Sequence, residues 1–215
     1  IYTITHNKES DDQLVDFTGC PTSYNINSTT TLGTPKRAGY TFKNWLVTAV
    51  DYTPFKDIKT PWSITTYPAA FSLNGKNGNI TVVPQWEPTP YTATLKLNGG
   101  YLYGDRDATA DINIPYTVEQ TLALEQNLQK DYHTFEGFYK VTATEDNSSW
   151  QVSDTLYDSR TPFDAGSYGN VTFTAQYTPI PYTITYIVPQ GAYCIETQSF
   201  NYTQAVNLAT PVYTG

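Results

Sequence analysis

Several residue types that build reactive sites are scarce in this 215-residue sequence. It has no methionine, two cysteines and two histidines, and only 15% of its residues are charged. Cys20 and Cys194 lie far apart and outside any Cys-x-x-Cys pair, so we expect free thiols or a link between two molecules. His6 and His133 are also isolated, which favours structural or surface roles. Since nucleophile motifs, phosphate loops and His-x-x-x-His pairs are missing too, we predict a protein that is not an enzyme and binds no cofactor.

Long apolar runs and basic clusters are lacking as well. No stretch of about 18 apolar residues exists, so insertion into a membrane is not expected. The net charge is −8, and an acidic surface repels nucleic acid and anionic lipid, which are not expected partners. The sequence does contain 19 tyrosines, 9 phenylalanines and 4 tryptophans. These aromatic residues supply enough apolar area for a core, and we therefore expect a folded, mainly β protein.

The sequence repeats itself after about 91 residues. The stretch at 78–86 is Gly-Asn-Ile-Thr-Val-Val-Pro-Gln-Trp, and the stretch at 169–177 is Gly-Asn-Val-Thr-Phe-Thr-Ala-Gln-Tyr. Each is followed by two prolines and by a strand-like Tyr-Thr-x-Thr that also opens the chain at residues 2–5. The predicted domains are repeat unit 1 at 1–89, repeat unit 2 at 90–180 and the start of a truncated third repeat at 181–215.

Paired prolines join the predicted units. Pro88 and Pro90 stand at the first junction, and Pro179 and Pro181 stand at the second. Proline holds φ near −65° and cannot donate a backbone hydrogen bond, so these linkers should be short and stiff. The expected arrangement is an elongated array of two complete units plus a partial third.

Large rings at matched positions form the predicted core of each unit. Burial of such a ring contributes about 3 to 5 kcal/mol, judged by truncation to alanine. The predicted core residues are Phe42, Trp45 and Trp86 in the first unit and Phe135, Phe138 and Tyr177 in the second. Between these core positions lie variable inserts that contain Trp62 and Trp150, which are the candidate ligand contacts.

Two segments leave alternatives open. Val118, Leu122 and Leu128 share one side of a helix through residues 119–130, so a short helix competes with strand or irregular structure there. Asp105, Asp107 and Asp111 offer oxygen ligands of the kind that calcium prefers. That run lacks the glycine and the final glutamate of an EF-hand loop, and Arg106 lies within it, so a solvated loop is favoured over a weak calcium site.

Four stretches carry a family resemblance: Gly-Tyr-Thr-Phe-x-x-Trp at 39–45, the Trp62 segment, the Gly-Asn stretch at 78–86 and Tyr-Thr-Ala-Thr-Leu-x-x-Asn-Gly-Gly at 91–100. Together they resemble the internalin B-type repeat, also called the Listeria–Bacteroides repeat, of bacterial cell-surface proteins. The resemblance implies a small α+β, β-grasp-like unit, which is extracellular, located at the cell surface and free of enzymatic residues. Tyr132 stands where the first copy has Gly39, so this sequence departs from the pattern.

Three functions are consistent with these observations. The leading hypothesis is a structural stalk segment of an extracellular bacterial adhesin, whose partners are neighbouring repeats of the same polypeptide. The second is a module for cell adhesion that recognises host-surface protein or glycan through Trp62 or Trp150. The third is a subunit of a self-assembling fibre or sheath, in which homo-assembly uses an open sheet edge.

Overall fold

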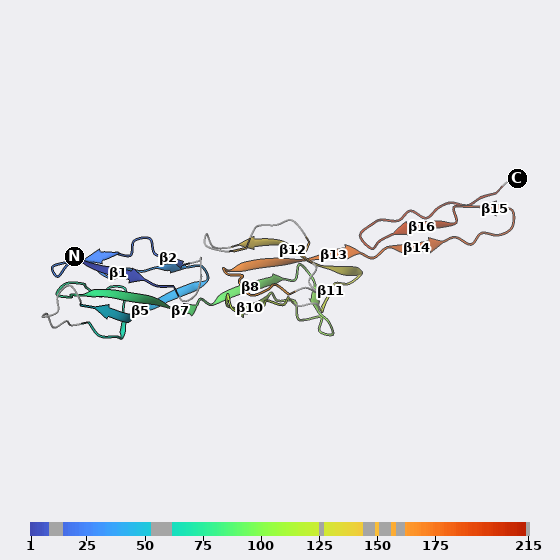
Figure 1. The fold of residues 1–215 in the computed structure, drawn as a ribbon. Helices are drawn as coiled ribbons and strands as arrows, with labels where there is room; N and C mark the ends of the chain where they lie inside the picture. Colours follow the sequence, from blue (N-terminus) through green and yellow to red (C-terminus); the bar gives the residue numbers. More distant parts are fainter. Residues whose placement is uncertain are drawn as a thin grey trace. The chain divides into compact units, whose positions relative to one another are not determined.

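The structure is a computed structural model that describes residues 1–8, 15–52, 62–124, 127–143, 149–150, 156–157 and 162–213. Within these ranges the chain is mainly β, and no residue is helical (Figure 1). The described residues therefore contain no helix that could cross a membrane. The chain divides into two compact units. Unit 1 comprises Ile1–Tyr91, Tyr116–Gln120 and Asp164–Gly169, and unit 2 comprises Thr92–Pro115, Thr121–Phe163 and Asn170–Gly215.

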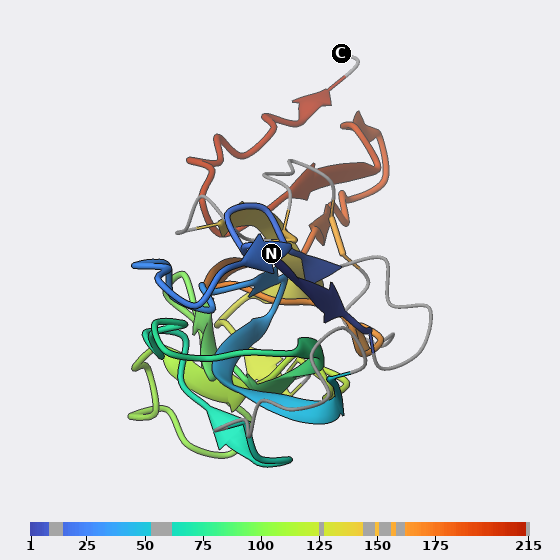
Figure 2. The ribbon, with the colours of Figure 1, turned by 60° about the vertical axis from the view of Figure 1, so that its left-hand side comes forward.

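The first sheet has seven strands. They are β1 (Tyr2–His6), β2 (Val15–Asp16), β3 (Ser23–Tyr24), β4 (Lys36–Arg37), β5 (Tyr40–Asp51), β6 (Thr66–Tyr67) and β7 (Asn79–Pro88). Their order is β2-β4-β5-β7-β1-β3, with β6 paired to β5. Figure 1 labels β1, β2, β5 and β7 of this sheet, and Figure 2 shows the same ribbon turned by 60°. The first and last long strands of the unit, β1 and β7, are parallel neighbours, whereas β5 runs antiparallel to β7.

Trp45 lies at the centre of the core of unit 1. Buried and more exposed residues alternate at residues 45–47 of β5, whereas residues 82–84 of β7 are buried in succession. Trp45 is fully buried, and its indole Nε1 donates a hydrogen bond to the Gly33 carbonyl at 2.8 Å. The rings of His6 and Phe42 lie 5.2 Å and 5.4 Å from its ring. The predicted ring cluster thus contains a histidine as well.

The second sheet has four strands in the order β10-β8-β13-β12. These strands are β8 (Tyr91–Lys96), β10 (Ile112–Tyr116), β12 (His133–Ala143) and β13 (Val171–Pro179), and a separate pair is formed by β9 (Tyr101–Leu102) and β11 (Leu128–Gln129). Phe138 and Phe173 are fully buried in its core, with their ring centroids 6.3 Å apart.

The two sheets repeat one pairing scheme. β8 is parallel to β13 with Ala93 opposite Val171, as β1 is parallel to β7 with Ile4 opposite Ile80. The antiparallel pair matches too, because Phe135 faces Tyr177 as Phe42 faces Trp86. In each copy a register shift follows the phenylalanine immediately, between Phe42 and Asn44 and between Phe135 and Gly137. The repeated sequence therefore builds a repeated sheet.

Residues 182–213 form two further antiparallel pairs. β14 (Tyr182–Thr185) pairs with β16 (Thr197–Phe200), and β15 (Ala192–Tyr193) pairs with β17 (Val212–Tyr213). β14 carries the same Tyr-Thr-x-Thr pattern as β1 and β8. Within the described residues it has β16 as its one sheet neighbour.

The helical part of the predicted α+β fold is wrong for the described residues. At 119–130, where a short helix competed with irregular structure, residues 119–124 are turn or irregular and Leu128–Gln129 form β11; residues 125–126 lie outside the described ranges. The Thr117 N–H donates to the Gln120 side chain at 2.8 Å. Leu122 exchanges two backbone hydrogen bonds with Phe163, at 2.9 Å and 2.8 Å. Because Phe163 uses both backbone groups of Leu122, that residue cannot form the bonds of an α-helix.

Candidate functional site

The described part of unit 2 has an open groove whose volume is about 360 Å³. Its lining combines tyrosine rings with charged side chains: Gly99, Tyr101, Arg106, Lys130, Asp131, Tyr132 and Tyr202. The β9–β11 pair positions one side of it, since Tyr101 lies opposite Gln129 and the chain continues directly into Lys130 and Asp131. The groove therefore collects residues from three separate segments of the sequence.

A tight turn precedes β9 and brings the backbone close to the core. Asn98 and Gly99 have φ values of 51° and 77°, which asparagine and glycine tolerate better than other residues. A Cβ atom at Gly100 would overlap the hydroxyl of Tyr177 and would lie 2.8 Å from the Gln129 carbonyl oxygen. The Asn-Gly-Gly sequence is thus required by both the turn and the packing beneath the groove.

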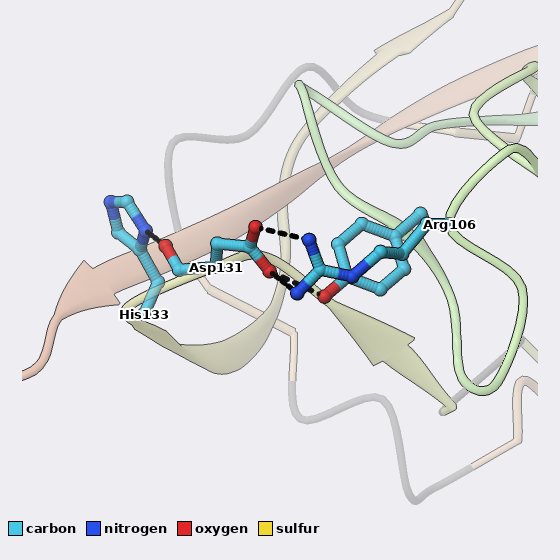
Figure 3. A network of polar contacts seen from close by, with 4 residues as sticks. Arg106, Asp131 and His133 are labelled. Carbon is cyan, nitrogen blue, oxygen red and sulfur yellow. Dashed lines mark hydrogen bonds and ion pairs between the residues drawn. The ribbon is translucent and has the colours of Figure 1, made fainter.

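Asp131 organises the polar side of the groove (Figure 3). Its carboxylate receives the guanidinium of Arg106 in a two-point contact, with both N–O distances at 2.8 Å. The same carboxylate accepts the hydroxyl hydrogen of Tyr101 at 2.7 Å, and this bond raises the pKa of Tyr101. The backbone carbonyl of Asp131 lies 2.8 Å from Nδ1 of His133. Four residues are thereby held in one network, in which a planar guanidinium and a carboxylate face solvent.

Two exposed tyrosines form the aromatic side of the groove. Tyr132 and Tyr202 are 57% and 49% exposed, and their ring centroids lie 5.3 Å apart. Tyr132 has a φ of 62°, a left-handed conformation that costs a non-glycine residue about 1 to 2 kcal/mol. Gly39 has the same conformation at the matching position of the first copy, with a φ of 77°. A strained backbone at an exposed aromatic residue is typical of functional positions.

The sequence-predicted ligand contacts lie inside the units instead. Trp62 and Trp150 are 6% and 8% exposed. The indole Nε1 of Trp62 donates to the hydroxyl of Tyr24 at 2.8 Å, and the ring of Trp150 lies 4.8 Å from that of Phe163. Neither ring presents an open face to a ligand.

The predicted core residues divide into two groups. Trp45, Phe138 and Tyr177 are buried, whereas Phe42, Trp86 and Phe135 are half-buried at the end of each sheet. The half-buried rings still pack on one another, with Phe42 and Trp86 5.7 Å apart.

The acidic run and the cysteines contribute no assembled site. Among the described residues, no group of three or more His, Cys, Asp or Glu side chains is placed to hold a metal ion, so Asp105, Asp107 and Asp111 are not brought together. The Asp105 carboxylate accepts the backbone N–H of Asp107 at 3.1 Å instead. Cys20 and Cys194 are half-buried free thiols, and burial raises the pKa of Cys20.

Sequence reasoning missed the groove because its members are distant along the chain. The one local signal is the replacement of glycine by Tyr132 at a matched position. Comparison with known proteins gives no match: no family model, no curated protein and no solved structure matches this chain. The class of protein that the fold defines is therefore a mainly β chain with a repeated mixed sheet.

Proposed function

We propose that this chain is a non-catalytic stalk segment of an extracellular bacterial cell-surface adhesin. The observation that carries the proposal is the duplication of one sheet, with the order β3-β1-β7-β5 repeated as β10-β8-β13-β12. Proteins built from stacked copies of one unit grow in length by adding units, which is the property that a stalk requires. The assignment to a bacterial surface protein rests on the resemblance of the motifs at 39–45, 78–86 and 91–100.

The repeat is proposed to be a variant of the β-grasp-like unit. Support comes from the mixed sheet, in which the first and last long strands of a copy are central and parallel. Within the described residues an irregular segment takes the place of the helix. Its apolar side chains still enter the core, since Leu32 in the first copy and Leu124 in the second are 0% and 5% exposed.

Small-angle X-ray scattering on the whole chain tests the stalk proposal. A compact globule of 215 residues has a radius of gyration of about 17 Å. A single 90-residue unit has a radius of gyration of about 12 Å, so two such units placed end to end have a radius of gyration of about 20 Å. The remaining residues increase this value. The expected result is therefore a radius above about 20 Å with a skewed distance distribution. A value near 17 Å with a symmetric distribution contradicts the proposal.

A second candidate function, recognition of an oligosaccharide, is favoured by the groove. Exposed tyrosine rings stack on the apolar faces of sugars, and the Arg106–Asp131 pair offers both donors and acceptors to hydroxyl groups. The probes are N-acetyllactosamine and its sialylated form, titrated by NMR into the whole chain. Binding should disappear in Tyr202→Ala and persist in Tyr103→Ala, a control at a residue that is 72% exposed and does not line the groove. Equal loss in both variants contradicts a site at the groove.

A further inference from the structure

The third Tyr-Thr-x-Thr strand is less covered than the first two. Tyr2 of β1 is 7% exposed, but the equivalent Tyr182 of β14 is 38% exposed. The difference is larger at the next core position. Leu32, Leu124 and Leu208 are equivalent, since each lies eight residues after the end of the strand β3, β10 or β16. Leu32 and Leu124 are 0% and 5% exposed, whereas Leu208 is 69% exposed. The leucine position that is buried in two copies is therefore open to solvent in the third.

One edge of β14 is also open among the described residues. In the first copy this edge is filled by β7, and the Asn7 N–H donates to the Val82 carbonyl at 2.8 Å. On β14 the Tyr186 N–H donates to Glu196 at 3.0 Å, on the side of β16. Because backbone groups alternate along a strand, the N–H group of Thr185 points to the opposite side, where the parallel strand lies in the other copies. Ile187 follows β14 at the position that Asn7 has after β1.

A side-chain bond marks where the parallel strand begins. Asn79, at the start of β7, accepts the backbone N–H of Thr3 at 2.9 Å. Asn170, just before β13, accepts the backbone N–H of Thr92 at the same distance of 2.9 Å. Thr183 is the equivalent of both threonines on β14. An incoming strand that begins with asparagine would find the same donor there.

We propose that the open edge of β14 binds an extended polypeptide segment of the pattern Asn-[Ile/Val]-Thr-apolar, which adds as a parallel strand. The asparagine side chain accepts the Thr183 N–H, and the backbone carbonyls accept the N–H groups of Thr185 and Ile187. The alternating apolar side chains of the segment cover Tyr182 and Leu208, as Ile80 and Val82 of β7 share one buried cluster with Tyr2 and Leu32. This site goes beyond the stalk function and stands on the comparison of the three strands alone.

The experiment uses the whole chain, labelled with ¹⁵N, and a synthetic peptide with the sequence of residues 169–177. We expect saturable shift changes and slowed hydrogen exchange at the amides of Thr183, Thr185 and Ile187. A peptide with alanine in place of its asparagine should bind about fivefold more weakly, because one hydrogen bond of about 1 kcal/mol is lost. Scattering of the same sample tests the stalk proposal separately.

Two matched pairs make the result specific. In the peptide, aspartate at the Phe173 position should abolish binding because that side chain faces the core in β13, whereas aspartate at the Thr174 position should not. In the chain, Thr185→Pro removes one amide of the open edge, leaves the β16 side intact and should abolish binding. Three results overturn the proposal: no saturable binding, shifts centred on Ala93–Lys96 through exchange with β13, or protection of β14 by self-association without peptide.

Discussion

Tyr24 offers the sharpest test of how the core of unit 1 is held together. Its hydroxyl donates to the Gly78 carbonyl at 2.6 Å and accepts the indole N–H of Trp62 at 2.8 Å. The side chain is 4% exposed, and burial raises the pKa of Tyr24 to about 12, so the hydroxyl keeps its proton at neutral pH. Tyr24→Phe removes the hydroxyl and leaves the ring in place.

The expected loss of stability follows from the Gly78 carbonyl and the Trp62 indole N–H, which both lose their hydrogen bond to the Tyr24 hydroxyl. Each buried polar group deprived of a hydrogen bond costs about 1 to 3 kcal/mol, so Tyr24→Phe should destabilise unit 1 by about 2 kcal/mol or more. With a urea dependence of about 1 to 1.5 kcal/mol per molar for a small unit, the midpoint should fall by about 2 M. Tryptophan fluorescence follows this transition directly, since Trp45, Trp62 and Trp86 lie in unit 1.

Two further variants decide how that shift is interpreted. Tyr103→Phe, at a residue that is 72% exposed, should change the stability by less than about 0.5 kcal/mol. The double variant Tyr24→Phe with Trp62→Phe should cost less than the sum of the two single variants, because both partners of one bond are removed. A midpoint shift below about 0.5 M for Tyr24→Phe would refute the reasoning.

Three other predictions concern single contacts. Gly100→Ala should destabilise unit 2 by about 2 kcal/mol or more, since its Cβ would overlap the Tyr177 hydroxyl; urea unfolding measures it. Asn170→Ala should cost about 1 to 2 kcal/mol through the lost bond to the Thr92 N–H, again by urea unfolding. Burial lowers the pKa of His6, so the thermal midpoint of unit 1 should fall as the pH drops below about 6.5.

Each of these predictions has a matched control variant. Gly104→Ala has open space around its Cβ and should cost only the strain of its positive φ, about 1 kcal/mol. Asn170→Asp keeps the oxygen that accepts the Thr92 N–H, so its stability in urea should remain close to that of the parent chain. His6→Phe should remove the pH dependence below about 6.5, because the folded state prefers the neutral form of His6. If the thermal midpoint of unit 1 in the parent chain did not change with pH below about 6.5, burial of His6 would not be lowering its pKa.

The strands could be predicted well from local pattern. The strand-like pattern at residues 2–5 and the repeated stretches at 78–86 and 169–177 lie within two residues of the bounds of β1, β7 and β13. The parallel pairing of β1 with β7 could not be predicted, because no local signal specifies which strand more than seventy residues away becomes the neighbour. Of the two alternatives left open at 119–130, irregular structure and a short strand are observed in the described residues, because pairing of Leu122 with Phe163 overrides helical periodicity.

The candidate site was harder to predict than the fold. Aromatic residues in variable inserts suggested Trp62 and Trp150, but composition cannot distinguish a ring that packs inward from one that faces solvent. The exposed rings, Tyr132 and Tyr202, come from segments 70 residues apart, and only folding brings them within 5.3 Å. The informative sign was the departure from the repeat at Tyr132.

The parallel placement of β1 beside β7, repeated as β8 beside β13, has a mechanical consequence. A force that pulls the two ends of a copy apart acts at the beginning of its first strand and at the end of its last strand. Two parallel neighbours pulled in this way are sheared along their length, so their evenly spaced hydrogen bonds carry the load together. Rupture then demands simultaneous failure of the whole ladder, whereas a hairpin would unzip one bond at a time.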